Sequence, residues 1–261
     1  MFFINTLTFV AVLIPLWRMD PALLTPSERA ARGRGQLRAG IAYIRRQPTI
    51  MLLLGVVFLF GTFCMNTQVT NALMATTVFH RGSAAYGLLG TIMAVGSLSA
   101  ALLAARRTKP SMPILVIALL GFGVSSLIGG LAPNYTFYAI SMVPLGLSAL
   151  TVMTTANAAV QLAADPTMRG RVMALYMAVF MGGTPIGSPM IGWIAQTVGT
   201  RASVLAGAVV AVVTAIGATI VLVRRSAHTL SELPALLHRH LDPEHEDDEP
   251  SATVPTTTRA A

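Results

Sequence analysis

Seven stretches of the chain are apolar and contain no charged residue. They cover residues 2–17, 49–72, 86–105, 113–131, 137–160, 172–195 and 202–223. Most are about 19 to 24 residues long, which at roughly 1.5 Å per helical residue matches a hydrocarbon core of about 30 Å. Spanning strands would need an alternation of apolar and polar positions, which these stretches lack. The pattern therefore predicts an all-α polytopic membrane bundle of seven transmembrane helices.

The composition agrees with a membrane location. Hydrophobic residues make up 54% of the 261 residues and charged residues only 11%, whereas about a quarter of a soluble protein is charged. These values exclude an ordinary soluble enzyme domain and a disordered protein. The single cysteine, Cys64, excludes an internal disulfide and a cysteine-rich metal site.

The basic residues predict the orientation of the bundle. The connections on one side and the segment after the last stretch contain clusters of Arg and Lys, and those on the other side contain only Arg81 and Arg201. By the positive-inside rule, the basic side and the C-terminus are cytoplasmic. The net charge of +8 therefore reflects the basic residues of the cytoplasmic side. It does not indicate a nucleic-acid partner, and we expect none.

The first stretch is the exception in this topology. It has about 16 residues and no basic region or cleavage site of a signal peptide. We expect the chain to be the C-terminal part of a longer transporter, cut within a helix, with the missing N-terminal half or a second copy as its partner. The expected division is a shortened helix at 1–17, a basic central loop at 18–47, a six-helix bundle at 48–225 and an acidic disordered tail at 226–261.

The central loop predicts an amphipathic helix over 27–46. Thr25-Pro26-Ser27-Glu28 is a typical helix start, and apolar residues follow at helical spacing with arginines on other faces. We expect it to be a linker held by anionic lipids rather than a regulatory site. The tail has a plausible short helix near 229–241. Its histidines lie beside carboxylates without fixed spacing, so we expect no metal there.

No ionisable residue lies within the seven stretches. Proteolysis by paired Asp, a His-ligated metal or a Ser with a His base would need such residues at membrane depth. We therefore expect a protein that is not an enzyme and has no cofactor. Any proton coupling would use residues that are not in this chain.

Neutral polar residues form two stripes at membrane depth. One lies on the stretch 49–72, the other on 137–160, where Thr154 and Asn157 lie beside it. Helix–helix hydrogen bonding is one interpretation. We favour the other, a substrate cavity lined by Thr62, Asn66, Gln68, Thr70, Asn71, Ser141, Ser148, Thr151 and Thr155.

Small residues and prolines are concentrated in the stretch 172–195. Glycines four apart allow two backbones to approach closely, and prolines favour a bend. The pattern indicates either a pivoting helix or static close packing. The residues concerned are Gly183, Pro185, Gly187, Pro189 and Gly192, with Ser188 a further small residue.

The sequence Asp165-Pro166-Thr167-Met168-Arg169-Gly170-Arg171, followed by that helix, resembles the penultimate helix of the major facilitator superfamily (MFS). Within this superfamily, the sequence looks most like the bacterial secretion and efflux group that includes enterobactin and macrolide exporters. Phe3-Ile4-Asn5-Thr6-Leu7-Thr8-Phe9 is similar to that branch's sixth helix, and Tyr86-Gly87-Leu88-Leu89-Gly90 with Gly96 to its eighth. The resemblance covers residues 1 to about 225.

This resemblance implies helices 6 to 12 of a twelve-helix transporter in the bacterial inner membrane, with the seventh and tenth helices lining the cavity. Asp165, Arg169 and Arg171 would form the family's cytoplasmic gating turn. The loop 105–112 lacks the Asp that often precedes its Arg in the family. The implied function is efflux of a small drug-like or siderophore-like molecule by alternating access. The alternative is a non-transporting membrane scaffold or an inactive remnant.

Overall fold

The computed structural model describes residues 36–107 and 110–241, and every regular element in these ranges is helical. The helices are α2 (Gln36–Arg46), α3 (Pro48–Leu59), α4 (Thr67–Leu73), α5 (Ser83–Ala105), α6 (Met112–Gly130), α7 (Tyr135–Ala163), α8 (Arg169–Thr197) and α9 (Thr200–Leu241), with π-helical turns η2 (Phe60–Cys64) and η3 (Met74–Val78) flanking α4. The predicted all-α bundle is confirmed.

Six of the described helical segments are long and apolar enough to cross a membrane. They are Pro48–Val78, Ser83–Ala105, Met112–Gly130, Tyr135–Ala163, Arg169–Thr197 and Thr200–Arg224. Each contains or overlaps one predicted stretch. The other predicted stretch, 2–17, lies outside the described residues, as do residues 27–35 of the predicted linker helix and 242–261 of the predicted tail.

Local sequence signals determine where several helices begin. Pro48 opens α3 and Pro113 lies in the first turn of α6, where a missing backbone N–H has no cost. The Asn134 side chain caps α7 by accepting a hydrogen bond of 3.0 Å from the Phe137 N–H. Gly199, with φ +117°, makes the tight turn between α8 and α9.

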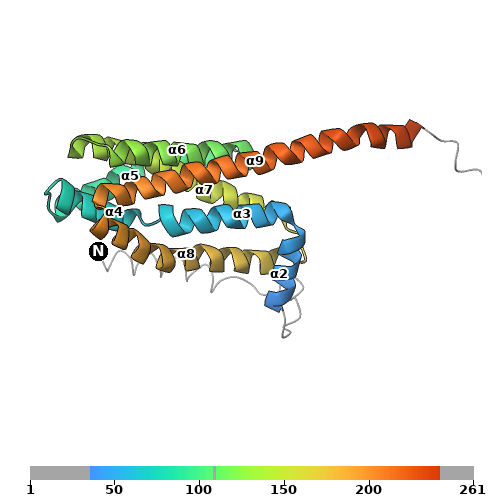
Figure 1. Ribbon diagram of the computed structural model, residues 1–261, viewed down its shortest axis with the longest axis horizontal. Helices are drawn as coiled ribbons and strands as arrows, with labels where there is room; N and C mark the ends of the chain where they lie inside the picture. Colours follow the sequence, from blue (N-terminus) through green and yellow to red (C-terminus); the bar gives the residue numbers. More distant parts are fainter. Residues whose placement is uncertain (1–35, 108–109, 242–261) are drawn as a thin grey trace, which may run out of the picture.

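Successive spans run in opposite directions (Figure 1). α7 contacts α5 and α6, α6 also contacts α9, and α8 contacts η2 and α9. α2 crosses one end of the bundle, beside the starts of α3 and α8. We call this the α2 end. α9 leaves the bundle at the same end (Figure 1).

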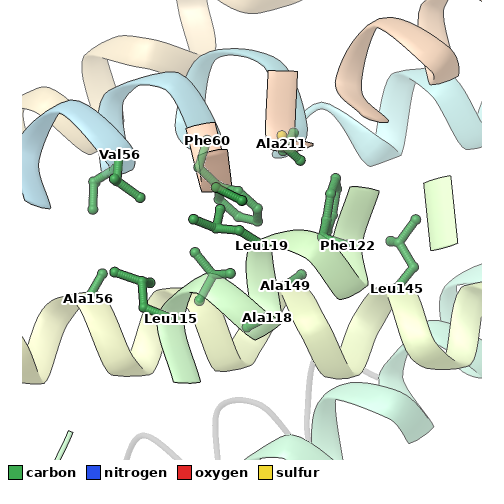
Figure 2. Close-up of a cluster of buried hydrophobic side chains, with 14 of the residues drawn as sticks. Val56, Phe60, Leu115, Ala118, Leu119, Phe122, Leu145, Ala149, Ala156 and Ala211 are labelled. Carbon is green, nitrogen blue, oxygen red and sulfur yellow. The ribbon is translucent and has the colours of Figure 1, made fainter. Parts of the chain in front are cut away.

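The core of the bundle lies between α3, α6, α7 and α9. Figure 2 shows Phe60 beside Leu119 of α6, and Val56 on the side of Leu115 and Ala156. The Phe60 and Phe122 rings meet edge to face with centroids 5.0 Å apart. Large apolar side chains such as Leu98 are instead exposed on the outer faces of the bundle, as expected where lipid is the solvent.

Glycines bring α5 and α7 into backbone contact. A Cβ atom on Gly96 would overlap the Val143 carbonyl oxygen, and one on Gly146 would overlap the Met93 carbonyl oxygen. Ser97 adds a hydrogen bond of 3.3 Å from its Oγ to the Gly146 carbonyl. Lipid offers no hydrophobic drive for helix association, so close backbone packing of this kind holds the two helices together.

The first described span differs from the single straight helix expected over 49–72. α3 widens into η2, the chain bends at Met65 and Asn66, and α4 resumes the helix. Thr62 Oγ1 donates to the Phe58 carbonyl (2.7 Å) and Asn66 Nδ2 donates to the Thr62 carbonyl (2.6 Å). These side chains offer backbone carbonyls a second donor in the distorted region, which apolar periodicity does not reveal.

The last helix includes the short helix expected near 229–241. α9 runs to Leu241 without a break at residue 225, so this helix continues the last span instead of standing apart from it. Leucines at 230, 233, 237 and 241 recur at helical spacing, which favours continuation of the helix.

The α5–α7 contact predicts that Gly96→Ala will destabilise the protein by about 1–3 kcal/mol, because the added methyl group must displace backbone of α7. Unfolding of the purified protein in detergent measures the effect. Gly90→Ala is the matched control, since nothing lies within 4 Å of a Cβ atom at that position of the same helix. Equal stabilities of the two variants would contradict the close packing.

Candidate functional site

The polar stripe of the first span and the glycine face of α8 lie against each other. Thr62 and Asn66 are buried, and the Ser188 hydroxyl donates a hydrogen bond of 2.5 Å to Asn66 Oδ1. A Cβ atom on Gly187 would overlap the Thr62 carbonyl oxygen, and one on Gly183 would lie 2.9 Å from Thr62 Oγ1. Two features that the sequence predicts separately thus form one helix contact.

The other residues of the predicted pivot do not take part in this contact. No described atom lies within 4 Å of a Cβ atom built on Gly192. α8 runs without a break through Pro185 and Pro189. The close-packing part of the pattern is therefore present at Gly183 and Gly187, and a pivoting motion stays a prediction.

A small polar cavity lies beside the helix break. Its volume is about 20 Å³, which is room for about one water molecule. Asn66, Thr70 and Asn71 border it, and the buried Tyr138 hydroxyl donates a hydrogen bond of 2.7 Å to Asn71 Oδ1. Gln68 is exposed and does not border this cavity.

The predicted stripe on α7 is buried against α6 over much of its length. A Cβ atom on Gly129 would lie 2.9 Å from Ser141 Oγ, and one on Gly121 would lie 2.7 Å from Ser148 Oγ. The Thr151 hydroxyl, also buried, donates a hydrogen bond of 2.7 Å to a carbonyl of its own helix. In this conformation these three residues are buried, and the Ser141 and Thr151 hydroxyls bond carbonyls of α7 itself instead of groups on another helix.

Two larger cavities lie beside the C-terminal half of α7. The first, the Tyr176 cavity, has about 330 Å³ and is lined by Met153, Thr154, Asn157, Tyr176, Met177 and Phe180. The second, the arginine cavity, has about 440 Å³ and is lined by Ala104, Arg107, Pro110, Ile114, Thr154, Thr155, Ala158, Gln161, Leu162 and Arg169. Thr155 is the one residue of the predicted α7 stripe that lines either of them.

Among the α7 residues that line these cavities, the polar residues Thr154, Asn157 and Gln161 recur at i, i+3 and i+7. Gln161 Nε2 donates a hydrogen bond of 2.6 Å to Asn157 Oδ1. Sequence reasoning placed Thr154 and Asn157 only beside the stripe and missed Gln161 and Tyr176. Extending the helical period beyond the apolar stretch, which ends at 160, would have found Gln161.

The predicted gating turn contacts α2. The Tyr43 hydroxyl donates a hydrogen bond of 2.9 Å to Asp165 Oδ2 and accepts one of 3.1 Å from the Asp165 N–H. Arg171 packs beside Gly40 of α2, and its Nε is buried without a hydrogen-bond partner. Arg169 lines the arginine cavity. The turn therefore connects α2 to the start of α8.

Charge is distributed unevenly between the ends of the bundle. Asp165 is the single carboxylate between residues 29 and 231. At the end opposite α2, Arg81 lies over the Tyr135 ring (5.6 Å) and Arg201 over the Phe79 ring (6.0 Å). Within the described residues, no three His, Cys, Asp or Glu side chains are grouped as metal ligands would be.

The family comparison covers nearly the whole chain. The family model MFS_3, whose description is transmembrane secretion effector, matches residues 1–246. The chain belongs to this family. Membership together with six apolar helical segments among the described residues makes it a multi-pass membrane protein of an MFS transporter family. Neither a curated protein nor a solved structure matches the chain.

The Asn66–Ser188 hydrogen bond predicts energetic coupling between the two helices. In a double-mutant cycle, the effects of Asn66→Ala and Ser188→Ala on the free energy of unfolding should differ from additivity by about 0.6 kcal/mol. This value is the average for hydrogen bonds between helices within membranes. Unfolding in detergent measures the cycle. The pair Asn66→Ala and Ser99→Ala is the control and should be additive, because Ser99 lies on α5, is only partly buried and bonds the Val95 carbonyl of its own helix. Additivity in both cycles would refute the coupling.

The contact between Tyr43 and Asp165 predicts that Tyr43→Phe will loosen α2 from the bundle. Loss of the hydroxyl should lower the free energy of opening α2 by about 1 kcal/mol. Amide exchange in α2 should therefore be about fivefold faster. Hydrogen exchange read by mass spectrometry over 36–46 tests this. Tyr86→Phe, at an exposed tyrosine of α5, should leave α2 unchanged. Equal protection of α2 in both variants would show that the pair does not hold the helix.

Proposed function

We propose that this MFS_3 protein takes part in the export of a small organic molecule by alternating access. The observation that carries this proposal is the face of α7 formed by Thr154, Asn157 and Gln161, which borders cavities of ligand size in a member of a transporter family. The motif from Asp165 to Arg171 supports assignment to the branch of enterobactin and macrolide exporters.

The Tyr176 cavity indicates the substrate chemistry. Met153, Met177 and Phe180 offer an apolar and adaptable wall, and Asn157 and Tyr176 add neutral polar groups. The Tyr176 hydroxyl is buried without a well-formed hydrogen bond. A substrate with an apolar body and a few neutral hydrogen-bonding groups fits this lining, as a drug-like or siderophore-like molecule would.

Alternating access would use the contact between α8 and the broken span. In the described conformation Gly183 and Gly187 lie against Thr62, so the polar side chains there are buried. Separation of these helices in a second conformation would expose the predicted cavity residues Thr62, Asn66, Thr70 and Asn71. The prolines of α8 favour such a bend.

The six-helix bundle would work with a second bundle. The halves of MFS transporters are parallel repeats around an axis along the membrane normal. An N-terminal half or a second copy of the chain has the required orientation. The basic residues of α2, of the α5–α6 loop and of the α8 start support a cytoplasmic α2 end, and thus a cytoplasmic C-terminus in a bacterial inner membrane.

The proposed function predicts that Asn157→Leu will reduce export several-fold and shift the substrate range, because it removes a polar group from the Tyr176 cavity. Efflux from cells that lack other pumps measures this, with the partner half supplied where required. Ser99→Ala, at a partly buried position of α5 that lines neither cavity, is the control at equal expression. Export unaffected by Asn157→Leu would remove this cavity from the pathway. Complete inactivity of the unaltered chain in any combination would favour the scaffold or remnant.

A further inference from the structure

The arginine cavity at the α2 end is lined by two cationic side chains from separate helix ends. Arg107 follows the end of α5 and Arg169 begins α8. The lining also includes the apolar residues Ala104, Pro110, Ile114, Ala158 and Leu162. At about 440 Å³ the cavity is within the size range of small-molecule sites. It combines two positive charges with an apolar surface.

These charges lack an acidic counterpart in the cavity. No carboxylate lines it, and the loop from 106 to 112 contains no Asp or Glu. Asp165, four residues before Arg169, bonds instead to the Tyr43 hydroxyl of α2. Thr154 and Gln161 add neutral polar groups on α7. Two guanidinium groups that converge on one cavity without a carboxylate are suited to a bidentate oxyanion.

We propose that the arginine cavity binds the phosphate group of an anionic amphiphile, with the apolar part of that molecule against Ile114, Ala158 and Leu162. Arg107 and Arg169 hold the phosphate. Two sources share this chemistry: the headgroup of an anionic phospholipid from the adjacent leaflet, and a free organic phosphate. The site goes beyond the proposed export function, whose substrate occupies the neighbouring Tyr176 cavity.

A shared residue connects the two cavities. Thr154 lines both of them, and Gln161 of the arginine cavity donates a hydrogen bond to Asn157 of the Tyr176 cavity. An occupant of the arginine cavity therefore contacts the helix face that would bind the exported molecule. This placement is suited to an anionic lipid that affects transport from the cytoplasmic side.

Lipid binding to the full-length chain tests the site directly. The protein is reconstituted in nanodiscs of phosphatidylcholine mixed with phosphatidylglycerol, and native mass spectrometry counts the lipids that remain bound. We expect preferential retention of phosphatidylglycerol. Arg107→Gln and Arg169→Gln should each weaken it about fivefold, the effect of one basic residue near an anionic surface. Both arginines are exposed, so the variants should fold.

The matched control is Arg106→Gln, which removes an adjacent exposed arginine that does not line the cavity. It should leave retention unchanged, and Arg107→Lys should retain most of the binding. Equal loss in Arg106→Gln and Arg107→Gln would overturn the proposal, because binding would then reflect general surface charge.

A second measurement separates the two sources. Inorganic phosphate is titrated against the chain in a neutral detergent while thermal unfolding is followed. Thermal stabilisation by inorganic phosphate that requires Arg107 and Arg169 supports a free phosphate as the ligand. Retention of phosphatidylglycerol without stabilisation by inorganic phosphate supports the lipid headgroup. Neither effect in the unaltered chain would refute the site. Because neither measurement involves transport, failure of the export proposal would leave the result unaffected.

Discussion

The absence of water from the hydrocarbon core is the constraint on which the rest of this structure depends. A polar group at that depth must find its partner within the protein. Most hydroxyl groups in the spans meet the constraint locally, as when Thr154 donates to the Leu150 carbonyl one turn earlier. Asn66 cannot be satisfied in this way alone. Its Nδ2 bonds the Thr62 carbonyl, its Oδ1 accepts from Ser188, and the helix deforms around it.

The same constraint explains the distribution of glycine. A short side chain such as Ser188 can reach a neighbouring helix only if the two backbones approach closely, and Gly187 permits this at the Thr62 carbonyl. The α5–α7 interface applies the same principle, with Gly96 and Gly146 on opposite sides and Ser97 bonding across it. Apolar burial adds to these contacts at the core of α3, α6, α7 and α9 (Figure 2). Small residues determine which helices meet, and larger side chains fill the remaining space.

Sequence reasoning was most successful for properties that depend on one helix alone. The length and apolarity of the six described spans follow from hydrophobic transfer, which acts residue by residue. The cavities lie between helices, so their positions depend on how the helices pack. Polarity and helical period alone could not distinguish Ser148 from Thr155. Ser148 is buried against Gly121, whereas Thr155 lines a cavity. Tyr176 was missed because an aromatic residue in an apolar stretch has no distinguishing signal until α7 is placed beside it.

Asp165, the single carboxylate between residues 29 and 231, joins three helices of the bundle. Asp165 lies in the turn between the cavity-lining helix α7 and the glycine-rich helix α8, and its side chain contacts α2 rather than the nearby arginines. A carboxylate paired with Arg169 would reduce the positive charge at the arginine cavity. By bonding Tyr43, Asp165 instead attaches α2 to the start of α8 while Arg107 and Arg169 retain their charge at the cavity. A movement of α2 would therefore be transmitted to α8, the helix whose glycines enclose the polar break.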